Sequence, residues 1–249
     1  MNRISAAVNR IQPSATLAMT QRVGELKRAG VDIIGLSAGE PDFDTPDFVK
    51  EGAIAAIRAG KTKYTDVGGT PELKAAIIAK FKRDNALDYS ADQIIVGVGG
   101  KQVLFNALCA TVDAGDEVII PAPYWVSYPD IVAYAGGTSV FIAAGADQNY
   151  KITPAQLEAA ITPKTRWVLL NSPSNPTGAA YSKAELAALG EVLRAHPDVL
   201  ILTDDMYEHV WYAATPFATI AEACPDPYAR TSTVNGWSKH YGMTGWRLG

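Results

Sequence analysis

Residues 235–249 read Asn235-Gly-Trp-Ser-Lys-His-Tyr-Gly-Met-Thr-Gly-Trp-Arg-Leu-Gly249, which places Lys239 in a loop of Ser and Gly, eight residues before Arg247. A lysine amine can form a Schiff base with an aldehyde, and a guanidinium can clamp a phosphate with two parallel hydrogen bonds. The segment therefore indicates a cofactor that carries both groups. A solvated lysine in a flexible Gly-rich loop is the other interpretation, and the rest of the chain decides between them.

Upstream of this segment, short runs rich in Val and Ile alternate with longer segments of helical periodicity. This alternation is typical of an α/β fold with a mostly parallel sheet between helices. The chain predicts strands at 32–36, 93–98, 117–120, 139–142, 166–171, 199–203 and 231–234, and helices at 16–29, 71–83, 101–112, 126–134, 154–160 and 183–195. Thr70, Thr153 and Ser182 stand where helix N-caps are expected.

Polar residues follow several of the predicted strands directly. Residues 99–101 follow one strand, 171–175 another, and 204–207 a third. Ligands of open α/β sheets bind at the carboxyl ends of the strands, so these residues are expected to form one site.

The Gly99-Gly100-Lys101 turn joins a predicted strand to a predicted helix. Its glycines allow backbone N–H groups to approach an anion at the positive end of the helix dipole. The turn lacks the further glycine of a nucleotide-binding P-loop and the third glycine of a dinucleotide fingerprint. With Arg247 available, a phosphate cradle is a better interpretation than a tight turn alone.

Two further segments suit the ring of an aromatic cofactor. In the first, at 171–178, prolines on both sides of Asn175 fix the backbone. In the second, Asp204 could keep a pyridine nitrogen protonated, and Tyr207 could donate to a ring oxygen together with Asn175. An Asx turn and a helix N-cap are the alternative readings of the two segments. Trp125 could stack on such a ring, although a tryptophan is more often part of the core.

Composition narrows the functional classes. The chain has 249 residues, a hydrophobic share of 48% and a net charge of −4, with basic residues spread singly, so no nucleic-acid role is expected. Its three histidines lack metal-ligand spacing, and two distant cysteines make no disulfide framework. No apolar run approaches a bilayer's thickness, and the N-terminus lacks a signal peptide, so a cytoplasmic location is expected.

Seven segments in order resemble the class I and II aminotransferases, and in particular their bacterial aspartate aminotransferase subgroup. They are Gly39-Glu-Pro-Asp-Phe-Asp-Thr-Pro46, Lys61-Thr-Lys-Tyr64, Gly99-Gly-Lys-Gln102, Pro123-Tyr-Trp-Val-Ser-Tyr-Pro129, Ser172-Pro-Ser-Asn-Pro-Thr-Gly178, Asp204-Asp-Met-Tyr207 and the Lys239 segment. The resemblance implies pyridoxal 5′-phosphate as cofactor and a fold type I enzyme with a seven-stranded type of sheet. It also implies a homodimer, with amino acids and 2-oxo acids as substrates.

The resemblance assigns a role to each matching residue. Lys239 would carry the cofactor and shuttle the substrate's α-proton, and Asp204 would pair with the ring nitrogen. The implied cofactor-binding set also contains Gly99, Gly100, Lys101, Trp125, Asn171, Asn175, Tyr207, Ser238 and Arg247, with Tyr64 reaching a neighbouring subunit's phosphate. Gly39, Trp125 and Asn175 would face the substrate. Lys101 would also attract a second carboxylate of an acidic substrate.

The implied reaction is ping-pong transfer of the amino group of aspartate, or a related amino acid, to 2-oxoglutarate. Residues 1–45 would form an arm and part of a small domain, and residues 46–249 an incomplete cofactor-binding domain. Family members continue well past Gly249, so the chain is expected to be an inactive fragment of a longer enzyme. Three kinds of alternative stay open: aromatic, alanine or prephenate aminotransferases, carbon–sulfur lyases, and a non-catalytic module that binds the cofactor.

Overall fold

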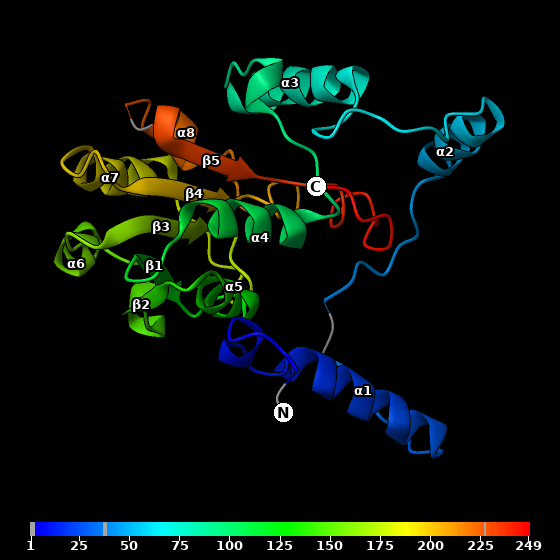
Figure 1. The fold of residues 1–249 in the computed structure, drawn as a ribbon, viewed down its shortest axis with the longest axis horizontal. Helices are drawn as coiled ribbons and strands as arrows, with labels where there is room; N and C mark the ends of the chain where they lie inside the picture. Colours follow the sequence, from blue (N-terminus) through cyan, green and yellow to red (C-terminus); the bar gives the residue numbers. More distant parts are fainter. Residues whose placement is uncertain (1–2, 37–38, 227) are drawn as a thin grey trace.

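In the part of the chain that the structure describes, five parallel strands form one sheet in the order β2-β1-β3-β4-β5 (Figure 1). The structure is a computed structural model that describes residues 3–36, 39–226 and 228–249. The strands are β1 (Glu117–Ala122), β2 (Thr138–Ala143), β3 (Thr165–Asn171), β4 (Leu200–Asp204) and β5 (Thr231–Val234). The predicted α/β fold, an incomplete parallel sheet between helices, is confirmed, and the described residues contribute five strands to that sheet.

Helices lie between the strands and before them. The α-helices are α1 (Ala15–Arg28), α2 (Asp47–Arg58), α3 (Pro71–Asn85), α4 (Gly100–Thr111), α5 (Ser127–Ala135), α6 (Pro154–Ala160), α7 (Lys183–Arg194) and α8 (Ile220–Ala223). Short 3₁₀ turns are η1 (Val8–Arg10), η2 (Ala91–Gln93), η3 (Ala146–Gln148) and η4 (Tyr228–Arg230). The side chains of Thr70, Thr153 and Ser182 cap α3, α6 and α7, as the sequence predicts.

The side chains of successive residues in the central strands lie on opposite faces of the sheet, because side chains alternate along a strand. On one face, Ile119 and Val168 pack in a cluster that includes Leu157 of α6 and Leu189 of α7. On the other face, the neighbouring strand residues pack against α4 and α5, in a cluster that includes Val118, Leu169, Leu108 and Ile131. Both faces of the sheet are therefore covered, and a site can form only at an edge where the strands end.

Two predicted strands are not strands. Residues 93–98 begin at the end of η2, and their backbone contacts are isolated, such as the mutual hydrogen bonds between Gly97 and Gly249 at 2.8 and 3.1 Å. Residues 32–36 are irregular, and Ile34 and Leu36 are 84% and 90% exposed. Apolar residues form a strand only where a neighbouring strand completes the hydrogen-bond ladder, and neither segment has one among the described residues.

Helices α1 and α2 extend away from the sheet. Helix α2 was not predicted, and neither α1 nor α2 has a buried residue. Figure 1 shows both helices projecting from the body that carries the sheet. Arg10, the last residue of η1, is an anchor: its guanidinium donates to the carbonyls of Ala133 and Tyr134 in α5 at 2.6 and 2.7 Å. The division into residues 1–45 and 46–249 stays a prediction.

None of the helices in the described part of the chain combines the length and apolarity needed to cross a membrane.

Candidate active site

The carboxyl ends of β3 and β4 hold two of the predicted site residues side by side. Asn171 is the last residue of β3, Asp204 is the last residue of β4, and the two are paired in register. The Asn171 side-chain amide donates to the backbone carbonyl of Asp204 at 2.7 Å. Its side-chain oxygen accepts from the backbone N–H of Asn175 at 2.8 Å. Asn171 therefore joins the turn that carries Asn175 to the strand that carries Asp204.

Asp204 presents a buried carboxylate at this edge. Its Oδ2 accepts from the hydroxyl of Tyr128 at 2.7 Å, and its Oδ1 accepts from the backbone N–H of Met206 at 3.2 Å. Burial raises the pKa of Asp204, and these two hydrogen bonds oppose the rise. Both donors are neutral, so the carboxylate has no cationic partner among the residues that the structure describes. A protonated ring nitrogen would supply that partner.

Tyr128 was missing from the sequence-based site. It lies in the first turn of α5 and is 1% exposed. Its only sequence signal is its position three residues after Trp125, which puts both side chains near one end of the helix. That spacing does not reveal a contact with a residue 76 positions further on.

Tyr207 and Lys239 face one another across the site. The Lys239 Nζ lies 5.9 Å from the centre of the Tyr207 ring. Burial raises the pKa of the Tyr207 hydroxyl, and a hydrogen bond with the Asn175 side chain opposes the rise. Tyr207 and Asn175, which the sequence predicts to act on one ring oxygen, are therefore brought together.

The Lys239 amine is partly withdrawn from water. Burial lowers its pKa, and the negative charge of Glu40 acts in the opposite direction. The amine donates to the backbone carbonyl of Gly39 at 2.6 Å, across 200 residues of sequence. Gly39, the predicted substrate-facing residue, thus lies beside the Lys239 amine. Ser238, next to Lys239, is buried.

Gly99 and Arg247 are in direct contact at the start of α4. Gly99 has a φ of +83°, and a Cβ atom at this position would lie 2.4 Å from Nη2 of Arg247. Gly100 is similarly tight, because a Cβ there would lie 2.5 Å from the Met206 side chain. Gly99 suits this position because of its positive φ, and both residues allow the N-terminus of α4 and the guanidinium to lie close together. This pair of donors suits a phosphate.

Lys101 and Trp125 meet at the same place. The Lys101 Nζ lies 4.8 Å from the centre of a Trp125 ring. Burial lowers the pKa of Lys101, the positive charge of Arg247 lowers it further, and Asp130 opposes the change. The predicted stacking face and the predicted phosphate groups therefore border one another.

Tyr64 is the predicted site residue that the structure leaves apart. Its side chain is fully exposed, in the segment between α2 and α3. No contact in the described part of the chain joins it to the rest of the site. Its predicted role in a neighbouring subunit is untested.

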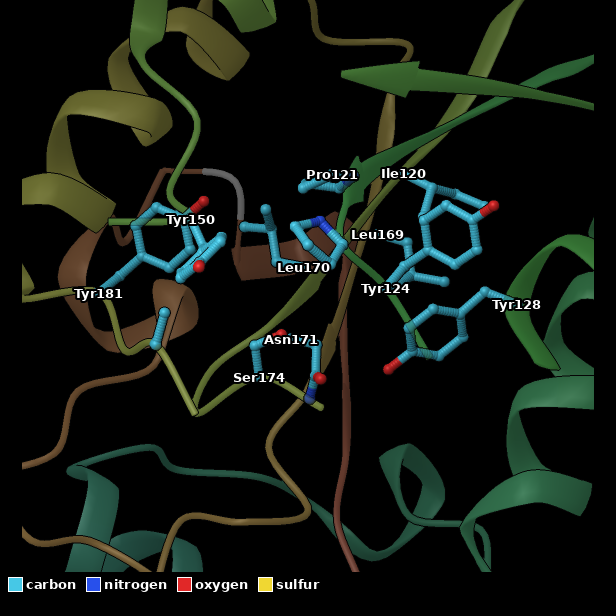
Figure 2. A pocket seen from close by; sticks show the side chains of 12 residues that line it. Ile120, Pro121, Tyr124, Tyr128, Tyr150, Leu169, Leu170, Asn171, Ser174 and Tyr181 are labelled. Carbon is cyan, nitrogen blue, oxygen red and sulfur yellow. The ribbon is translucent and has the colours of Figure 1, made fainter. Parts of the chain in front are cut away.

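A small cavity lies beside the site (Figure 2). It has a volume of about 20 Å³, enough for one water molecule, and its walls include Tyr124, Tyr128, Ser174 and Tyr181. Asn171 is the one predicted site residue that lines it. The cavity is too small for a cofactor, and apart from Asn171 the predicted site residues lie outside it.

Taken together, these side chains fit a pyridine aldehyde that carries a phosphate. They provide an amine for the aldehyde, a buried carboxylate for the ring nitrogen, a phenol and an amide for a ring oxygen, and a guanidinium beside two glycines for the phosphate. An α/β sheet that carries this donor set at the carboxyl ends of its strands is typical of enzymes that act on amino acids through pyridoxal phosphate.

Comparison with known proteins agrees with this class. Residues 31–249 match the family model of aminotransferase class I and II, and the chain belongs to that family. The family's cofactor is pyridoxal 5′-phosphate. The chain is 60% identical over 246 residues to a probable aspartate/prephenate aminotransferase of Rhizobium leguminosarum, and 61% identical over 246 residues to an aspartate/prephenate aminotransferase of Cereibacter sphaeroides.

Solved structures give the same result. The aspartate aminotransferase of Rhizobium meliloti matches with a TM-score of 0.96 at 54% identity. The match covers all of this chain and 62% of the Rhizobium meliloti chain. The aspartate aminotransferase of Thermus thermophilus with maleate matches with a TM-score of 0.94 at 45% identity. This match covers all of this chain and 64% of the Thermus thermophilus chain. The two curated relatives are matched over 99% of this chain, which spans 62% of their length.

Proposed function

We propose that this chain provides the cofactor-binding part of an enzyme that transfers the amino group of aspartate, or of a related amino acid, to 2-oxoglutarate by a ping-pong mechanism. The observation that carries the proposal is the grouping at one sheet edge of the Lys239 amine, the buried Asp204 carboxylate and the contact between Arg247 and Gly99. Aspartate as donor is supported by the names of the relatives.

When bound, pyridoxal phosphate supplies an aldehyde that condenses with amines and a ring that withdraws electrons from the substrate's α-carbon. The Asp204 carboxylate would hold a proton on the ring nitrogen, which strengthens that withdrawal. Its burial makes the interaction strong, because charges attract more in a medium of low dielectric constant. Tyr207 and Asn175 would share the ring oxygen, with Asn171 fixing the turn that carries Asn175.

Lys239 would act as the base once the substrate amine has replaced it. A lysine removes a proton only in its neutral form, and burial lowers the Lys239 pKa and so favours that form. The Lys239 Nζ would accept the proton from the substrate's α-carbon and hold it within the site for the next transfer. The second half of the cycle runs in reverse with a different oxo acid.

The remaining residues would bind and orient. Arg247 and the backbone N–H groups of Gly99 and Gly100 would hold the phosphate, with Ser238 beside them, and Trp125 would stack on the ring. Tyr64 would reach the phosphate of the partner subunit in a homodimer, which accords with its full exposure. The Gly39 backbone would face the substrate. The homodimer and a cytoplasmic location are part of the proposal and rest on the family resemblance.

Prephenate is a second candidate substrate, because the two curated relatives are named for both aspartate and prephenate. Aspartate and prephenate each carry a carboxylate beyond the one next to the reacting carbon, and Lys101 beside Trp125 is a cation that could attract it. A carbon–sulfur lyase would use the same lysine but would release ammonia in place of passing nitrogen to an acceptor.

Transfer of nitrogen tests the function. An enzyme of the relatives' full length that contains this chain is given pyridoxal phosphate, ¹⁵N-aspartate and 2-oxoglutarate, and the label is followed by NMR into glutamate. The 249-residue chain is assayed beside it and is expected to transfer no label. The proposal predicts labelled glutamate, its loss in Lys239→Ala, and a raised KM for aspartate in Lys101→Met. Labelled ammonia in place of glutamate would favour the lyase. Binding of the cofactor without movement of the label would favour the non-catalytic module.

A further inference from the structure

Tyr128 is buried between two groups of the site. Its hydroxyl donates to Oδ2 of Asp204 at 2.7 Å. Its ring meets Trp125 edge to face, with ring centres 5.4 Å apart and an angle of 86° between the ring planes. One side chain, only 1% exposed, therefore touches both the carboxylate and the predicted stacking face.

The Asp204 carboxylate depends on this hydroxyl. Its other hydrogen bond, from Met206, is long at 3.2 Å, whereas the bond from Tyr128 has the length typical of O–H donors. The other titratable groups that act on this pair are Asp205 and Tyr207. Asp205 accepts from Thr203 at 2.6 Å, and Tyr207 interacts with Asn175, so neither replaces Tyr128 as a donor to Asp204.

We propose that Tyr128 is a positioning residue that keeps the Asp204 carboxylate ionised and in one orientation for the ring nitrogen of the cofactor. The orientation follows from the hydrogen bond, which fixes one carboxylate oxygen and leaves the other beside the Met206 N–H. The ionisation follows because a donor to a carboxylate stabilises its charged form. The part that concerns the cofactor rests on the proposed function, and the part that concerns Asp204 does not.

The structure offers a matched control in Tyr181. Tyr181 is also buried, at 5% exposure, and lines the same small cavity as Tyr128 (Figure 2). Its hydroxyl accepts a hydrogen bond from the backbone N–H of Ile152 at 2.8 Å, and Ile152 is not a residue of the site. Tyr128→Phe and Tyr181→Phe thus each remove one buried hydroxyl, but only the first removes a donor to Asp204.

The first test uses the protein without cofactor. Aspartate is labelled with ¹³C at the carboxyl carbon, the Asp204 signal is assigned by its loss in Asp204→Asn, and its pH titration is followed by NMR. We expect the Asp204 midpoint to rise by about one to two pH units in Tyr128→Phe, the size of one hydrogen bond to a charged group. Tyr181→Phe is expected to leave it in place. An unchanged midpoint in Tyr128→Phe, or an equal rise in both variants, would overturn the proposal.

A second measurement needs no change at Tyr128, in case Tyr128→Phe does not fold. The hydroxyl proton of Tyr128 should appear far downfield in the proton spectrum, protected from exchange with water, and should move upfield in Asp204→Asn. Absence of such a proton in the unsubstituted protein would contradict the hydrogen bond itself.

The third test adds pyridoxal phosphate. Tyr128→Phe is expected to weaken binding about tenfold relative to Tyr181→Phe, and equal affinities would overturn the orienting role. Failure of the proposed function has a different signature. In that case Lys239→Ala would bind the cofactor as the unsubstituted protein does, while the titration of Asp204 would still decide whether Tyr128 controls the carboxylate.

Discussion

Lys80 of α3 and Glu208 form an ion pair that is largely shielded from water, with 22% of the lysine side chain and 5% of the glutamate side chain exposed. The carboxylate of Glu208 also accepts from the side-chain amides of Asn85 and Asn235, each at 2.7 Å. Glu208 follows Tyr207 directly, and Asn235 opens the segment that leads to Lys239. One buried carboxylate therefore ties α3 to two segments that carry site residues.

Loss of the lysine should destabilise the protein strongly. Lys80→Ala leaves the buried charge of Glu208 without its cation, which is expected to lower the free energy of unfolding by about 3 kcal/mol. Lys82 on the same helix is the control, because its pair with Asp88 is 66% and 75% exposed and should contribute less than about 1 kcal/mol. Urea denaturation of both variants measures the difference. Equal losses would show that the Glu208 pair is not a special element of the fold.

The contact between Gly99 and Arg247 predicts a loss of cofactor affinity on adding a single methyl group. Gly99→Ala would push the Arg247 guanidinium away, and we expect binding of pyridoxal phosphate to weaken by about tenfold or more. Gly115→Ala is the control, since Gly115 also has a positive φ, +103°, but has open space around its missing Cβ. Both substitutions should cost about 1–3 kcal/mol of stability through backbone strain. Isothermal titration would contradict the cradle if both variants kept the original affinity.

The buried Asp205 should make stability depend on pH. Burial raises its pKa to about 7, with Glu208 and Asp204 adding to the rise and a hydrogen bond from Thr203 opposing it. The folded protein therefore binds this proton more tightly than the unfolded chain. The resulting stability is complete below about pH 4 and is lost as the pH rises to about 7.

Asp205→Asn removes this titration and isolates its effect. The stability of the variant relative to the unsubstituted protein should increase between pH 4 and 7 by up to about 1.4 kcal/mol per pH unit, and then level off. Urea denaturation at a series of pH values measures the difference. A constant difference across that range would mean that Asp205 titrates normally in the folded state.

The parallel sheet could be predicted because its strands are buried on both faces. Residues such as Val168 and Leu169 serve opposite faces, so both must be apolar, and the resulting run is visible in the sequence. The candidate site could be predicted for a related reason, because Asn171 and Asp204 stand at the ends of such apolar runs. Local rules failed at 32–36 and 93–98, where the sequence resembles a strand but no regular partner strand is present among the described residues.

Long-range partners could not be predicted from spacing. The hydrogen bond from Tyr128 to Asp204 joins residues 76 positions apart, and that from Lys239 to Gly39 joins residues 200 apart. Such contacts depend on how helices and loops pack on the completed sheet. The same holds for Lys80 and Glu208, each of which looks like an ordinary surface residue in the sequence. The resemblance to aminotransferases supplied roles for single residues but did not supply these contacts.

The visible absorption spectrum of the protein with pyridoxal phosphate tests the role of Lys239 most directly. The comparison needs three samples, the unsubstituted protein, Lys239→Ala and Lys101→Ala, the last of which removes a nearby lysine that is not expected to react. We predict an absorption band that is present in the unsubstituted protein and in Lys101→Ala and absent in Lys239→Ala. The same band in Lys239→Ala, or its loss only in Lys101→Ala, would contradict the assignment of Lys239 as the residue that carries the cofactor.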